Sequence, residues 1–235
     1  MKNSNANSSP VSVVMLGATG TVGGQTVKTL LTIPDVERLT LLGRRSIPDL
    51  SDNIVHQHNI NIFDPHSYQK LLPGHHTAIC TLGVGQPSKI SKDDFVKIDK
   101  LAVIDFASEC KKAGIRHFEL LGSVGANSNS SSFYLRIKGE LVNELKALDF
   151  KQLSIFQPSL IITPTNRYGF SQAVSLRVWP FLKPILMGGL RKYRGVTVEL
   201  LGKAIAANIL TYKEGLEILF WDEFYDLNKT VVNKK

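Results

Sequence analysis

Short apolar runs alternate along the chain with longer stretches in which apolar residues recur at helical spacing. The first pattern is typical of buried strands and the second of amphipathic helices. Strands are expected at 11–16, 39–43, 54–62, 77–83, 117–123, 152–157 and 215–220, and helices at 20–31, 93–113, 134–148 and 199–210, with a further helix starting at Asp64 and Pro65. Because strands separated by helices form βαβ units, the sequence predicts an α/β fold with a doubly wound parallel sheet.

The alternation stops after Pro158. A loop is expected at 159–169, and residues 171–195 are apolar, basic and interrupted by prolines. This composition predicts a substrate or lid segment, residues 158–198, over the carboxyl edge of the sheet. Its basic charges leave three interpretations open: an anionic substrate, peripheral contact with an acidic membrane surface, or solvated charges on a lid.

The composition favours one globular domain, residues 11–235, behind a disordered polar tail at 1–10. The 235 residues are 43% hydrophobic and 20% charged, enough for one sizeable core. No apolar run is long enough to span a bilayer and the start lacks an apolar signal core, so we expect a cytoplasmic protein.

Cys80 and Cys110 are expected as buried free thiols, and no spacing indicates a metal site. The net charge of +8 suits a phosphorylated cofactor or solubility, and no nucleic-acid motif accompanies it.

A glycine-rich turn follows the first predicted strand. The sequence GATGTVG places Gly17, Gly20 and Gly23 between this strand and the first helix. The first glycine permits a tight turn, the second lets the backbone approach a pyrophosphate, and the third lets the helix pack closely on the sheet. The helix amino end then faces the anion. We therefore expect a bound dinucleotide, with further contacts from Thr19, Thr21 and Val22; the alternative is a purely structural turn.

Two arginines follow the second predicted strand. An acidic residue at this point favours the ribose hydroxyls of NAD(H), whereas an arginine favours the 2′-phosphate of NADP(H). A guanidinium binds phosphate through two hydrogen bonds and stacks on adenine, so Arg44 and Arg45 predict NADP(H). Arg44 is the first choice, and the alternative is that one of the two is only a solvated surface charge.

Tyr134 and Lys138 lie four positions apart at the start of a predicted helix, which puts the phenol and the ammonium on one face. An ammonium beside a phenol stabilises the phenolate, so Tyr134 is a candidate proton donor to a carbonyl oxygen. Ser123 follows the fifth strand, at the carboxyl edge where open α/β sheets bind ligands, and would polarise the same oxygen. Asp99 is expected to face the sheet as a polar anchor or as a partner of a backbone group, without a catalytic role.

Together, the segments GATGTVG, GRR, LGS and YLRIK resemble the atypical branch of the short-chain dehydrogenase/reductase superfamily. The run from Phe95 to Asn127, followed by FYLRIKGELVNEL, is most similar to the oxidoreductases related to the Tat-interacting protein. The likeness extends from Val11 to about Leu210 and is weakest at 168–194.

The resemblance implies a Rossmann fold, NADPH as cofactor, and Ser123, Tyr134 and Lys138 as a catalytic set, with the lysine also holding the nicotinamide ribose. It further implies cofactor contacts from Asn61 and Ile62 near the adenine, and from Leu82, Gly83, Pro158, Ser159 and Leu160. The chain departs from the family pattern where Asn61 replaces an aspartate, Gln157 an arginine and Gly122 a serine.

We expect an NADPH-dependent oxidoreductase that reduces a carbonyl-like small molecule by hydride transfer, with Tyr134 as the proton donor. The main alternative is a non-catalytic NADPH-binding regulator or scaffold, whose cofactor stabilises a surface for a protein partner. A third alternative is an epimerase or isomerase that acts on a nucleotide sugar, for which the chain looks short. The expected oligomeric state is monomer or homodimer.

Overall fold

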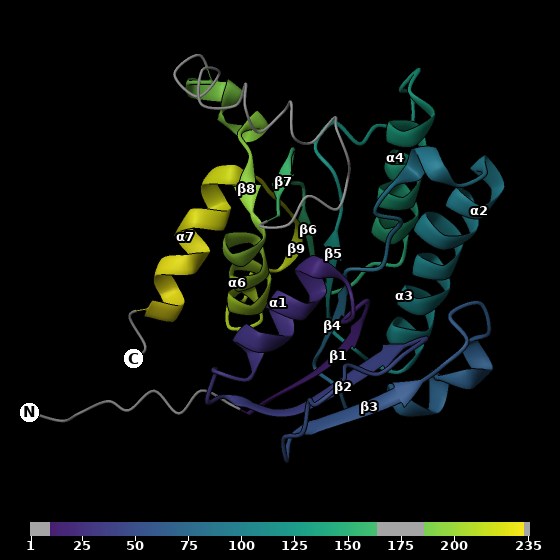
Figure 1. The fold of residues 1–235 in the computed structure, drawn as a ribbon, viewed down its shortest axis with the longest axis vertical. Coiled ribbons are helices and arrows are strands. Elements are labelled where there is room, and N and C mark those ends of the chain that lie inside the picture. The colour runs from purple at the N-terminus through teal and green to yellow at the C-terminus, as the bar shows by residue number, and fades with distance from the viewer. Residues whose placement is uncertain (1–9, 164–185, 233–235) are drawn as a thin grey trace, which may run out of the picture.

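The computed structural model describes residues 10–163 and 186–232, which build a seven-stranded parallel sheet of order β3-β2-β1-β4-β5-β6-β9 (Figure 1). Its strands are β1 (Val11–Leu16), β2 (Val36–Gly43), β3 (Val55–Asn59), β4 (Thr77–Cys80), β5 (His117–Leu121), β6 (Gln152–Phe156) and β9 (Gly215–Leu219). The chain adds β2 and β3 on one side of β1 and then returns to add the other strands on the opposite side. This order confirms the predicted doubly wound α/β fold.

Helices cover both faces of this sheet (Figure 1). One face carries α1 (Thr21–Leu30), α6 (Val198–Asn208) and α7 (Trp221–Val232), and the other carries α2 (Lys92–Val96), α3 (Ala102–Lys112) and α4 (Phe133–Ala147). Alternate residues of β1 divide between the two cores: Val13 and Met15 pack with α1 and α6, whereas Val14 and Leu16 pack with α3 and α4. Because both faces are covered, the inner strands β1, β4 and β6 are buried along almost their whole length rather than at alternate positions.

The long helix predicted at 93–113 forms, but it contains a π-helical turn. This turn, Lys97–Leu101, lies between α2 and α3 and carries Asp99, which is only 2% exposed. A π turn inserts one residue into the helical repeat, so the apolar positions before and after it no longer share one period of 3.6. Asp99 still faces inward from this turn, as expected.

The helix predicted to begin at Asp64 and Pro65 is wrong in type. Two 3-10 turns form instead, Pro65–Ser67 and Gln69–Leu71, and the Asp64 carboxylate accepts a hydrogen bond from the His66 amide as expected of a cap. Pro73 and Gly74 follow at once, and they leave too few residues for a longer helix.

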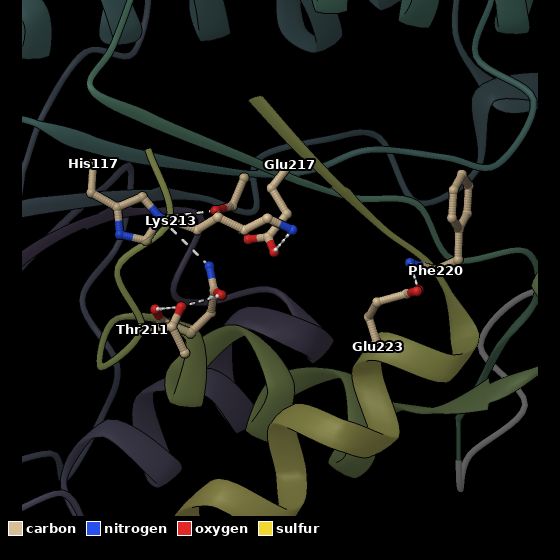
Figure 2. A network of polar contacts seen from close by, with 8 residues as sticks. His117, Thr211, Lys213, Glu217, Phe220 and Glu223 are labelled. Carbon is tan, nitrogen blue, oxygen red and sulfur yellow. Dashed lines mark hydrogen bonds and ion pairs between the residues drawn. The ribbon is translucent and has the colours of Figure 1, made fainter. Parts of the chain in front are cut away.

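Three further elements depart from the predictions. The loop predicted at 159–169 is wrong at β7 (Ile161–Ile162), which pairs in parallel with β8 (Val196–Thr197). Strands of two residues have no periodicity that a sequence pattern can reveal. Helix α7 was not predicted; it begins where the Glu223 carboxylate accepts a hydrogen bond from the Phe220 amide (Figure 2). Helix α7 is held against the sheet by Phe224, whose ring centroid lies 5.9 Å from the ring centroid of Phe156.

Parts of two predictions lie outside the described residues: the tail at 1–10, except Pro10, and most of the lid segment 158–198, from 164 to 185. Within the described residues, no helix is long and apolar enough to cross a membrane.

A buried polar cluster occupies the face of the sheet under α6. Glu119 of β5 is fully buried, and its Oε1 accepts a hydrogen bond of 2.9 Å from Asn208 Nδ2. Burial raises the pKa of Glu119 well above its ordinary value and lowers the pKa of His117 to about 3, so the imidazole is neutral at neutral pH. The 3.5 Å contact between them is therefore no ion pair. His117 bonds instead to Ser154 Oγ at 3.0 Å, beside Lys213 and Glu217 (Figure 2).

Glu119→Gln should stabilise the protein increasingly as the pH rises. The folded chain binds the Glu119 proton more tightly than the unfolded chain does. The contribution of Glu119 to the free energy of unfolding is therefore fully present below its unfolded pKa of about 4.3. It falls as the pH rises toward the folded pKa, by up to about 1.4 kcal/mol per pH unit. The amide cannot ionise and removes this loss. Urea unfolding at pH 5, 7 and 9 measures the difference.

Glu37→Gln, at an exposed position of β2, is the matched control and should follow the wild type. His117 contributes an opposite slope below pH ~6.5 but does so in all three proteins. Parallel curves for the wild type and Glu119→Gln would contradict the raised pKa of Glu119.

Candidate functional site

A cavity of about 810 Å³ opens at the carboxyl ends of β1 and β4, where the strand order reverses. Ligands of open α/β sheets bind at such a switch point. The lining comes from residues 20–23, 81–85, 121–122 and 159–161, and from Asp99, Tyr134 and Lys138. Of the predicted site residues, it includes Gly20, Thr21, Val22, Gly23, Leu82, Gly83, Tyr134, Lys138, Ser159 and Leu160.

The glycine turn brings the start of α1 directly against the end of β1. Gly17 has a φ of 97°, and a Cβ there would lie 2.6 Å from the Leu82 amide nitrogen. A Cβ on Gly23 would lie only 2.2 Å from the Gly17 carbonyl oxygen, a distance that no side chain tolerates. The Gly20 amide donates to the same Gly17 oxygen at 3.0 Å and closes the turn. The two Cβ clashes require glycine at positions 17 and 23.

The amino end of α1 suits an anion. Gly20 is the N-cap, and within the described residues no side chain caps this helix and no acidic residue stands in its first turn. The first backbone N–H groups of a helix have no intrahelical partner and carry the positive end of its dipole. Gly20 to Gly23 line the cavity, so a phosphate group there would meet backbone donors without a competing carboxylate.

Tyr134 and Lys138 lie on the α4 side of the cavity, and the structure gives each a partner on the facing helix. The Tyr134 ring lies 5.6 Å from the ring of Phe95. Lys138 Nζ lies 2.7 Å from Asp99 Oδ1 in an ion pair that is almost fully buried. The other carboxylate oxygen accepts a hydrogen bond of 2.8 Å from the Val84 amide. Asp99 thus fills both structural roles expected of it, anchor and backbone partner, and it also contacts a predicted site residue.

The sequence contained one signal for Asp99: a carboxylate on the apolar face of a long helix. Its partner Lys138 lies 39 positions further along the chain, in another helix, so the pattern alone cannot connect the two.

Arg44 and Arg45 are both exposed beyond the end of β2. Arg45 lines a small hollow beside the glycine turn together with Thr19, and Arg44 does not. The first choice of Arg44 therefore has less geometric support than Arg45.

The remaining predicted residues lie away from the cavity lining. Asn61 Oδ1 accepts a hydrogen bond of 3.1 Å from the Phe63 amide, and Ile62 is buried in the core. Ser123 Oγ makes only a long contact of 3.5 Å with the Val124 carbonyl oxygen. The Val124 amide donates to the Pro158 carbonyl at 3.0 Å, so Ser123 and Pro158 support the wall that Gly122 and Ser159 line.

The structure also describes the two cysteines and the possible metal ligands. Cys80 and Cys110 are buried free thiols, as predicted, and burial raises the pKa of Cys80 to about 12. Within the described residues, no cluster of three histidine, cysteine or acidic side chains could hold a metal ion.

Solved structures share this fold. MoeE5 in complex with UDP-glucuronic acid and NAD gives a TM-score of 0.67 at 14% identity, covering 88% of this chain and 75% of that one. The Citrobacter sp. triphenylmethane reductase complexed with NADP(H) gives 0.62 at 16% identity, covering 88% and 68%. The fold and the cavity at its switch point define the class: a doubly wound Rossmann-fold protein.

Sequence relatives narrow this class to a family, although no protein-family model matches the chain. HTATIP2 of Rattus norvegicus is 34% identical over 153 residues, which are 64% of this chain and 63% of the relative, just under two thirds of its length. FMP52 of Lodderomyces elongisporus is 30% identical over 195 residues, which are 74% of this chain and 81% of the relative. The chain belongs to the HTATIP2- and FMP52-related family of atypical short-chain dehydrogenases/reductases, which confirms the resemblance.

The same relatives correct the expected cytoplasmic location. FMP52 proteins at 26% to 31% identity are named as mitochondrial. The expectation rested on the missing apolar signal core, but mitochondrial transit peptides are amphipathic rather than apolar, so that test does not address them.

Two neighbouring glycines of α1 should respond oppositely to alanine. Gly23→Ala forces a Cβ against the Gly17 carbonyl and should destabilise the protein by roughly 1–3 kcal/mol. Gly24→Ala has its nearest neighbour at 3.6 Å and should stabilise the helix by roughly 0.5–1 kcal/mol. Urea unfolding of both variants tests the close approach, which would be refuted if the two alanines behaved alike.

Proposed function

We propose that the protein is an NADPH-dependent oxidoreductase that reduces a carbonyl-like small molecule. The observation that carries this proposal is one cavity with an uncapped helix amino end on one wall and the pair Tyr134 and Lys138 on another. Support also comes from the NAD and NADP(H) held by the two structures of the same fold.

In this proposal the chain's own groups divide the work along the cavity. Backbone amides of 20–23 hold the pyrophosphate, and Leu82 and Gly83 flank the nucleotide on the β4 side. Lys138 holds the nicotinamide ribose and faces the cavity beside Tyr134. When bound, the cofactor supplies the hydride. Tyr134 donates its phenolic proton to the substrate oxygen, and the ammonium of Lys138 stabilises the phenolate that remains.

We assign the choice of NADP(H) to the arginines after β2, and Arg45 to the phosphate because it shares the hollow beside the turn with Thr19. The substrate is proposed to enter from the side of 158–198, opposite the helix end. Ser123 is not among the described lining residues, so its proposed role is to shape the wall around Gly122, its neighbour in the chain.

A second candidate function is a non-catalytic NADPH-binding regulator. The observation that favours it is the position of Ser123, which leaves Tyr134 as the only predicted catalytic hydroxyl among the described lining residues. Binding without turnover separates this candidate from the enzyme.

Tyr134→Phe should lower turnover at least ~100-fold, because the variant lacks the proton donor but keeps the ring packed on Phe95. NADPH affinity, measured by calorimetry, should change less than about threefold. Turnover is followed as NADPH oxidation with a panel of aldehydes, ketones and quinones.

Tyr212→Phe, at a strongly exposed position, is the control and should match the wild type. Unchanged turnover in Tyr134→Phe would refute the proton-donor role. Tight NADPH binding with no oxidation in any variant would favour the regulator.

Arg45→Ala should weaken NADPH binding by roughly 10- to 100-fold and leave NADH binding nearly unchanged, because only NADPH carries the 2′-phosphate. Arg44→Ala is the matched comparison, and calorimetry with both nucleotides measures the four affinities. A larger selective loss in Arg44→Ala would reverse the assignment, and no selective loss in either would reject NADP(H) preference.

A further inference from the structure

One buried carboxylate connects three parts of the cavity that are far apart in the sequence. Asp99 Oδ1 lies 2.7 Å from Lys138 Nζ, and Asp99 Oδ2 accepts the Val84 amide at 2.8 Å. Asp99 is 2% exposed and Lys138 is 5% exposed. Both oxygens of the carboxylate are thus engaged, one by α4 and one by the loop after β4.

The contact between Asp99 and Lys138 is one of two matched contacts between α4 and the helix that contains the π turn. Phe95 and Asp99 are four positions apart on one helix, and Tyr134 and Lys138 are four positions apart on the other. Phe95 meets Tyr134 and Asp99 meets Lys138. Each proposed functional side chain is therefore held by one residue of the facing helix.

Gly83 provides the space for the ion pair. A Cβ at this position would lie 3.1 Å from Asp99 Oδ1 and 3.9 Å from Lys138 Nζ. A side chain at Gly83, which is predicted to contact the cofactor, would therefore press on the carboxylate and shift it by a few tenths of an ångström.

We propose that Asp99 is a positioning residue that holds the Lys138 ammonium against the cavity and ties the loop 83–85 to the same carboxylate. A buried ammonium is strongly unfavourable without a counter-charge, so removal of the carboxylate alone leaves an uncompensated cation. Its importance for catalysis rests on the proposed function, whereas the state of Lys138 does not.

The first test uses the cofactor-free protein. Acetylation of each lysine by acetic anhydride at pH 8 is followed by peptide mass spectrometry in the wild type, Asp99→Asn and Asp93→Asn. Because only the neutral amine reacts, Lys138 should react at least ~10-fold faster in Asp99→Asn. Asp93, exposed on the same helix, is the matched control and should change nothing. Equal Lys138 rates in the wild type and Asp99→Asn would overturn the proposal.

Lys100 serves as the internal reference in every sample. It is paired with Glu140 and Glu144, which raise its pKa, and neither substitution touches that cluster. A general loosening of the fold would accelerate Lys100 as well, and this outcome would count against a specific role for Asp99.

The second test separates positioning from binding. Asp99→Asn should lower kcat for NADPH oxidation by ~10- to 100-fold and change its pH profile relative to the wild type, with less than a threefold change in NADPH affinity. The kcat and pH profile of Asp93→Asn should match the wild type. Identical profiles for the two variants would overturn the positioning role. If the wild type neither binds nor oxidises NADPH, the proposed function fails, and the acetylation result alone decides on Asp99.

A third variant covers loss of folding. If Asp99→Asn does not fold, the double variant with Lys138→Met should fold again, because it removes the uncompensated ammonium together with its partner. A double variant as unstable as the single one would overturn the pairing.

Discussion

The amino end of α1 packs against the carboxyl end of β1 because Gly17 and Gly23 have no side chains there. A single Cβ at Gly23 would meet the Gly17 carbonyl oxygen at 2.2 Å, so the helix could not approach the sheet. This approach brings backbone N–H groups to the carboxyl edge between β1 and β4, where the reversal of strand order opens the cavity. The other walls of the cavity come from α4 and the loop after β4. They can contact the same ligand only because the amino end of α1 forms the remaining wall.

The two ends of the cavity differ in electrostatic character. The α1 end presents the positive pole of a helix without a capping side chain, which favours an anion. At the α4 end, the ammonium of Lys138 already has a partner in Asp99, so this end has little net charge to attract a phosphate. In the proposed function, this difference orients a ligand that has a charged and an uncharged part, with the uncharged part toward the phenol of Tyr134.

Two buried carboxylates illustrate how neighbours decide the state of an ionisable group. Asp99 lies against an ammonium and a backbone amide, and both favour a negative charge. Glu119 has an uncharged amide as its hydrogen-bond partner and a neutral histidine beside it, and burial raises its pKa. The first carboxylate borders the candidate site, whereas the second holds α6 to the sheet. Burial of an acidic residue alone therefore does not identify a functional position.

The sequence by itself determined the order of strands and helices, the parallel sheet, the glycine turn and the family. The element order, the sheet and the turn follow from apolar periodicity and from the steric freedom of glycine, which are local properties of the chain, whereas the family follows from the resemblance of its motifs. The tertiary structure alone decided the pairing of Asp99 with Lys138 and the position of Arg45 rather than Arg44 beside Thr19. It also decided the pairing of β7 with β8. Each of these depends on which distant segment packs against the residue, and spacing along one chain carries no information about that packing.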